Sequence, residues 1–129
     1  MIIKKPNNDH IAHAIDILDA NNTIVKGGKI DSTFKSYISS FGGSIIQSGL
    51  QGTLMTFEAN ESKKKIINLL FDVYNKSYTD TVNQTNGVYF RTIKTKTEAD
   101  KKLIRNRLVD MAVAVKLAMR CFETNDNEH

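Results

Sequence analysis

The sequence has a single cysteine, a single proline and no tryptophan. The lone Cys121 excludes an intrachain disulfide and any metal cage that needs several cysteines. Because there is no disulfide framework, we expect a reducing compartment, the cytoplasm. No apolar run approaches the length of about 18 residues that a membrane span needs, and no signal-peptide pattern follows Met1. We therefore expect neither a membrane span nor a secretory leader.

The position of the one proline is also informative. Pro6 precedes the first periodic segment, so no proline ring interrupts a helix further along the chain. A length of 129 residues with 40% hydrophobic residues suits one domain with its own core. The sequence thus predicts a single all-α domain over 1–129, a compact bundle of about five helices with a long C-terminal helix. We expect frayed ends at 1–8 and 124–129.

Apolar residues recur at helical spacing in the first part of the chain. They predict a first helix that begins at Asp9. Its apolar pattern continues less regularly through 24–25, and Gly27-Gly28 ends the helix. A second helix is expected to begin at Asp31 or Ser32, because either side chain can accept a hydrogen bond from the first turn.

Glycines divide the stretch that follows. Gly42-Gly43 predicts a bend or a close helix contact in the second helix, since each glycine weakens a helix by about 1 kcal/mol. Ser48-Gly49 predicts a stop, after which residues 50–57 form a short third helix.

Two helices are expected in the second half. Asn60 caps the fourth helix, and residues 78–96 then lose the helical period. Within that segment Asn86-Gly87 predicts an ordered loop or a small hairpin. The last helix is the clearest element, because its apolar residues recur at steps of four and three: Ile104, Leu108, Met111, Val115, Ala118 and Phe122.

Residues able to carry catalysis are few. His10 and His13 lie three residues apart on the first helix, but no convincing set of further ligands completes a metal site. Cys121 falls in the last turn of a helix, where the negative end of the macrodipole disfavours a thiolate, and we expect a buried apolar side chain. The sequence therefore predicts a protein with no cofactor, no bound metal and no enzymatic activity.

Positive charge is concentrated in one part of the chain. Residues 61–96 carry seven basic and three acidic side chains, which alone equals the net charge of +4. Lys63, Lys64 and Lys65 occupy the first turn of the fourth helix, where the macrodipole disfavours cations. Either a phosphate backbone or the neighbouring Glu61 would compensate these lysines, and the sequence leaves both open.

Two further basic groups are candidates. Tyr89-Phe90-Arg91, with Lys94, interleaves rings and cations as surfaces for single-stranded nucleic acid do. The alternative is that the two rings anchor this segment to the core. Lys102 and Arg105 lie off the apolar seam of the last helix, where we expect them to be exposed.

Residues 34–54 read FKSYISSFGGSIIQSGLQGTL. This segment resembles the block that marks the small, all-helical subunit of type III-B CRISPR effector complexes, the smallest subunit of the Cmr complex. Gly42 stands where that family usually has proline, and Ser39, Ser40 and Ile46 stand where it often has basic residues. The positions that match are Phe34, Lys35, Ser36, Ile45, Gly49, Leu50, Thr53 and Leu54.

The resemblance implies a non-catalytic subunit in antiviral defence. Such subunits stack on one another into an inner filament, contact the backbone proteins and the large polymerase-like subunit, and line the channel for guide and target RNA. Two alternatives remain: the small subunit of a related CRISPR effector type, or a stand-alone helical enzyme or toxin that uses His10, His13 or Cys121. The candidate nucleic-acid-binding residues are Lys35, Lys63, Lys64, Lys65, Arg91, Lys94, Lys102 and Arg105.

Overall fold

The computed structural model describes residues 8–78 and 89–125, which form helices and one small sheet. The helices are α1 (Asn8–Asp19), α2 (Ser32–Glu58), α3 (Glu61–Ser77), α4 (Tyr89–Lys94) and α5 (Glu98–Met119). The strands are β1 (Val25–Lys26), β2 (Lys29–Asp31) and β3 (Glu123–Asn125). The predicted all-α class with a long C-terminal helix is confirmed.

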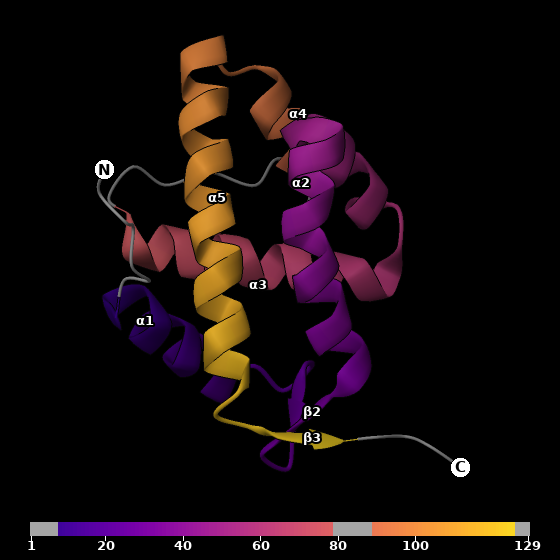
Figure 1. Ribbon diagram of the computed structural model, residues 1–129, viewed down its shortest axis with the longest axis vertical. Helices are drawn as coiled ribbons and strands as arrows, with labels where there is room; N and C mark the ends of the chain where they lie inside the picture. Colours follow the sequence, from indigo (N-terminus) through magenta and orange to yellow (C-terminus); the bar gives the residue numbers. More distant parts are fainter. Residues whose placement is uncertain (1–7, 79–88, 126–129) are drawn as a thin grey trace.

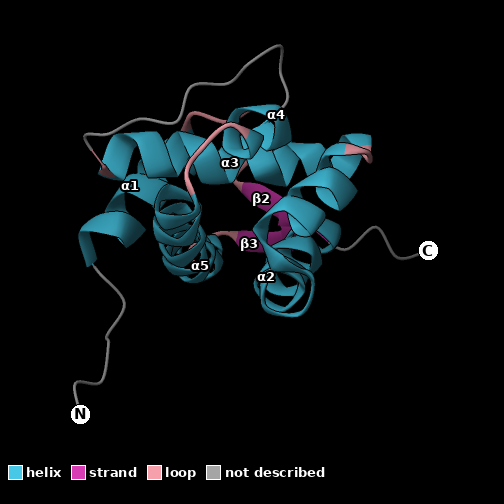
Figure 2. Ribbon diagram, turned by 90° about the horizontal axis from the view of Figure 1, so that it is seen from above, coloured by secondary structure: helices cyan, strands magenta, loops and turns pink. Residues whose placement is uncertain are grey.

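The helices lie in two layers. In Figure 1, α2 and α5 run side by side in opposite directions, and α3 crosses behind both of them. Figure 2, seen from above, shows α1, α3 and α4 together in the other layer. The sheet lies at the lower end of Figure 1, where β2 and β3 are adjacent. No other described helix covers the face of α2 and α5 turned toward the viewer in Figure 1.

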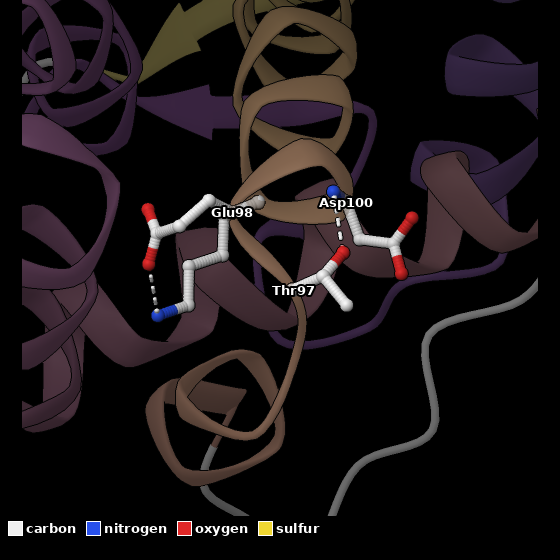
Figure 3. A network of polar contacts seen from close by, with 4 residues as sticks. Thr97, Glu98 and Asp100 are labelled. Atoms are coloured by element: carbon white, nitrogen blue, oxygen red, sulfur yellow. Dashed lines mark hydrogen bonds and ion pairs between the residues drawn. The ribbon is translucent and has the colours of Figure 1, made fainter.

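Polar side chains begin three of the helices. The Asp31 carboxylate accepts a hydrogen bond from the Thr33 N–H at 2.8 Å, and the Asn60 amide oxygen accepts one from the Lys63 N–H at 3.0 Å. Both predicted caps are confirmed. The Thr97 hydroxyl caps α5 by accepting from the Asp100 N–H at 3.1 Å (Figure 3). Each such cap contributes about 1 kcal/mol to stability.

The core lies where α3 meets α2 and α5. On α5 the predicted seam is buried from Ile104 through Ala118, while Phe122 follows the helix and is half-buried. Within α2, Phe41 and Phe57 stand on either side of Gly49 and meet edge-on, with 5.4 Å between ring centroids. The fully buried side chains of α3 are Ile66, Ile67, Leu69, Leu70, Phe71, Val73 and Tyr74.

A break at Gly49 divides α2 into two helical segments. Gly49 has φ 76° and ψ 173°, a region that is essentially restricted to glycine. The predicted stop at Ser48-Gly49, followed by a further helical segment, is confirmed. The predicted bend or close helix contact at Gly42-Gly43 is wrong, because the helix continues through both residues and no atom lies within 4 Å of a Cβ added at either.

Three expectations at the sheet were wrong. Residues 24–25 leave the first helix, because Gly27 and Gly28 adopt φ 59° and 75° and turn β1 back onto β2 as a hairpin. Residues 124 and 125 are not frayed, because β3 pairs in parallel with β2. At the other end of the chain, Asn8 is not frayed either, because it begins α1, while the expected frayed residues 1–7 and 126–129 lie outside the described ranges. Cys121 is exposed rather than buried, because it falls in the turn after α5.

Residues 89–94 form a helix, so the predicted ordered loop or small hairpin is wrong for them. The predicted turn at Asn86-Gly87 lies outside the described residues. The Glu58 carboxylate accepts hydrogen bonds from the backbone N–H groups of Tyr89 and Phe90, the latter at 3.0 Å. A carboxylate at this position satisfies N–H groups that the first turn of a helix leaves free. Glu58 thereby ties α4 to the end of α2.

Candidate nucleic-acid interface

Three cations of α5 surround an open pocket opposite the break in α2. The pocket has a volume of about 320 Å³ and is lined by Lys101, Lys102 and Arg105 on one side. Residues 48–52 of α2 form the other side, and Glu98 lines it as well. Because the break falls at Gly49, the chain on both sides of it contributes to the wall. We call this the upper basic pocket, after its position in Figure 1.

The carboxylate in the upper basic pocket neutralises one cation at most. Glu98 accepts from the Lys101 ammonium at 3.3 Å, and Figure 3 shows Glu98 on the first turn of α5. Arg105 donates to the Asn106 amide oxygen at 3.1 Å, which leaves its charge uncompensated. Among the described residues Lys102 has no hydrogen bond or ion pair, and it is exposed. The pocket therefore has a net positive potential suited to an anion.

A second basic pocket lies at the opposite end of the same two helices. It has a volume of about 110 Å³, and its lining consists of Lys35, Ile38, Ser39, Lys116, Met119 and Arg120. We call it the lower basic pocket. The Lys35 ammonium donates to the Phe122 carbonyl at 3.2 Å and to the Thr124 hydroxyl at 2.6 Å. Lys35 thus holds the C-terminal segment against α2, and these two bonds leave its positive charge in place.

The lysines at the start of α3 have an intramolecular partner that the sequence did not reveal. The Lys63 ammonium lies 5.6 Å and 5.2 Å from the ring centroids of Tyr37 and Phe57. Lys65 lies 5.9 Å from that of Phe34. Such cation–π contacts contribute about 0.5–1 kcal/mol each at exposed sites. The rings of α2 therefore offset some of the unfavourable field at this helix end.

This cluster is separate from the two pockets. Tyr37, which contacts Lys63, and Ser39, which lines the lower basic pocket, are two residues apart and so lie on roughly opposite sides of α2. The structure thus brings Lys102 and Arg105 together in one pocket. The start of α3, with Lys63, Lys64 and Lys65, lies against a different side of α2.

The aromatic residues of α4 belong to the core. Tyr89 is 4% exposed, and its ring stacks on Phe71 with 3.9 Å between centroids and 5° between planes. Phe90 is half-buried against the core, whereas Arg91 and Lys94 are exposed. The second interpretation of this motif is therefore correct for the rings, which anchor the segment and are not free to stack on bases.

Burial raises the pKa of Tyr89 to about 12, with a further contribution from the carboxylates of Asp72 and Glu58. In the unfolded chain the phenol ionises near pH 10. Because the folded protein favours the neutral phenol, the stabilisation from Tyr89 is complete below pH 10, and it is lost as the pH rises toward 12. Between these values the wild-type protein should lose up to about 2 kcal/mol more of its free energy of unfolding than Tyr89→Phe does. Denaturant titrations of both proteins across this pH range measure the difference, and parallel curves would contradict the assignment.

The histidines of α1 are engaged with neighbouring helices. His13 Nδ1 lies 2.9 Å from the Ser77 hydroxyl, and the His10 ring packs at 5.3 Å from that of Tyr78. Within residues 8–78 and 89–125 no group of three or more histidine, cysteine or acidic side chains is placed to hold a metal ion. None of the helices in these ranges is both long and apolar enough to cross a membrane.

Sequence reasoning missed part of both pockets. Lys101, Lys116 and Arg120 line them but are not among the candidate residues named from the sequence. The helical repeat of basic residues on α5 could have suggested a shared flank. That this flank faces Gly49 and Lys35 of α2 follows from tertiary packing, which the repeat does not encode.

Comparison of the chain with models of known families, with curated proteins and with solved structures gave no significant match. The resemblance in residues 34–54 therefore stays a prediction.

Proposed function

We propose that this protein is a non-catalytic, RNA-binding subunit of an RNA-guided effector complex of the type III-B CRISPR kind. In this role its basic side chains neutralise phosphates without reading sequence, since base pairing with a guide does the reading. The observation that carries the proposal is the upper basic pocket, where Lys101, Lys102 and Arg105 converge on one cavity.

The chemistry of this pocket suits a phosphodiester better than a catalytic role. Arginine and lysine bind phosphate oxygens through charge-assisted hydrogen bonds, and arginine can do so with two parallel bonds. No histidine, cysteine or tyrosine lines the pocket, and its one carboxylate is paired with Lys101. The lining therefore supplies cations to hold an anion, without an acid–base pair to transform it.

The resemblance and the geometry support the same role. Gly49 and Leu50 are two of the residues that match the Cmr small subunit, and they stand at the break that forms the pocket wall. In the proposed complex the protein contacts copies of itself, the backbone proteins and the large polymerase-like subunit. The remaining candidates, Arg91 and Lys94, would add charge near the end of α2.

The test is purification of the native assembly through an affinity tag on this chain. We expect RNA of guide length together with the other subunits of a type III-B effector. Replacing Lys102 and Arg105 by glutamine should leave the subunit composition intact and weaken RNA retention, so that the assembly loses its RNA at a lower salt concentration. In direct RNA binding by the free protein, the slope of log affinity against log salt should fall by about 1.4 if two phosphate contacts are lost.

The matched control is Lys26→Gln combined with Lys76→Gln, which removes the same charge from exposed positions outside both pockets. It should change the salt slope little, because the lost charges lie away from the pocket. An assembly that contains no RNA, or a pocket variant that retains RNA like the control, would refute the proposal. Co-purification with subunits of another effector type would support the related-type alternative in its place.

A further inference from the structure

The two basic pockets lie at opposite ends of the α2–α5 layer, and each takes its walls from both helices. We propose that a single strand of RNA runs from one pocket to the other along the line where α2 and α5 meet, with phosphates in both pockets; we call this path the groove. This inference rests on the proposed function and extends it, because it defines the path and the length of the bound strand.

Helical spacing places the pocket residues of each helix on one line. On α2 the steps of three and four residues connect Lys35, Ser39, Gly42, Ile46 and Gly49. On α5 the same steps connect Lys102, Arg105, Val109, Lys116 and Arg120, with Val113 completing the line. Each pocket takes its walls from both helices, so the two lines face each other along their length.

The spacing of the pockets fixes the length of strand that can join them. Lys102 and Lys116 are fourteen residues apart on α5, and Lys35 and Gly49 are fourteen apart on α2. At 1.5 Å per residue both pairs span about 21 Å. That distance corresponds to about six nucleotides at the stacked rise of ~3.4 Å. It falls within the site sizes of about 4–16 nucleotides found in other single-strand grooves.

The middle of the groove differs from its ends. Gly42 and Gly43 have open space where a side chain would project, so the backbone there is accessible. Ile46 is 69% exposed on one side and Val113 is 43% exposed on the other. These apolar side chains can contact sugars and base faces, which carry no charge. Cationic ends with an uncharged middle complement a strand whose outer phosphates enter the pockets.

The experiment measures the affinity of the protein for oligouridines of three, six and twelve nucleotides that carry a phosphate at both ends, so that the outer phosphates of the six-mer are six steps, about 20 Å, apart. In the wild-type protein we expect affinity to rise between three and six nucleotides, as the strand reaches the second pocket, and to change little beyond. Lys116→Gln with Arg120→Gln removes charge from the lower basic pocket, and Lys102→Gln with Arg105→Gln removes it from the upper one. Each double variant should lose the gain between three and six nucleotides and lower the salt slope for the twelve-mer by about 1.4.

Several outcomes would contradict the proposed path of the RNA strand. If only the upper-pocket variant weakens binding to the twelve-mer, the strand does not follow the groove, although the proposed function stands. If neither variant weakens RNA binding, both proposals fail. Affinity for polyglutamate that depends on both pockets, without any effect on RNA, would identify an acidic protein as the occupant. Circular dichroism melts of each variant serve as the control, and unchanged melts attribute the lost affinity to charge.

Discussion

Replacement of Tyr89 by alanine should lower the free energy of unfolding by about 3–5 kcal/mol. The ring is almost completely buried and stacks on Phe71, so its removal leaves a cavity between α4 and α3. The loss also weakens the packing of α4, whose first backbone N–H groups donate hydrogen bonds to the Glu58 carboxylate. Chemical denaturation followed by circular dichroism measures this change.

Tyr89→Phe is the matched variant, because it keeps the ring and removes only the hydroxyl. At neutral pH it should stay within about 1 kcal/mol of wild type. The alternative interpretation, in which the ring stacks on RNA bases, predicts a different pattern. Under it Tyr89→Ala would bind RNA more weakly while retaining wild-type stability, and that result would remove Tyr89 from the core.

The sequence predicted those helices whose signals are local. On α5 the apolar steps of four and three are visible without any partner, and the seam residues Ile104, Leu108, Met111, Val115 and Ala118 are buried as expected. The caps at Asp31 and Asn60 are equally local, since each side chain bonds an N–H two or three residues ahead. The break at Gly49 is also a local signal, because this single glycine ends one helical segment.

Features that depend on distant parts of the chain could not be predicted in this way. The strand β3 exists because residues 123–125 meet β2 and because Lys35, about ninety positions earlier, bonds Phe122 and Thr124. Nothing in the polar C-terminal sequence indicates that pairing. Periodicity also failed for 89–94, where Glu58 supplies the cap from another helix.

The candidate site shows the same division. Exposure of Lys102 and Arg105 was expected from their position off the seam of α5; Lys102 is exposed, whereas Arg105 is half-buried, so the expectation is wrong for Arg105. Their role as one wall of a pocket depends on the break in α2, which lies about fifty residues away in sequence. The lysines at the start of α3 were interpreted through the helix dipole alone, whereas rings contributed by α2 lie beneath two of them. The charge of a side chain follows from the sequence, whereas the groups that surround it are set by tertiary packing.

Gly49→Ala should lower the free energy of unfolding by about 1–3 kcal/mol, since an L-residue is strained at φ 76° and ψ 173°. No atom lies within 4 Å of the added methyl group, so the cost comes from the backbone and not from a clash. If the residue relaxes to a helical conformation, α2 straightens and residues 50–52 leave the wall of the upper basic pocket. We therefore expect a reduced salt slope of RNA binding, similar to that of Lys102→Gln with Arg105→Gln.

Gly43→Ala is the control for this substitution, because it adds the same methyl group to the same helix. Gly43 is helical and has open space around the added atom, so alanine should raise stability by about 0.5–1 kcal/mol. Denaturation of the two variants in parallel should therefore shift in opposite directions from wild type. Equal stability of Gly49→Ala and wild type would show that residue 49 does not need the glycine conformation. A destabilised Gly49→Ala protein that kept the wild-type salt slope would instead separate the break in α2 from RNA binding.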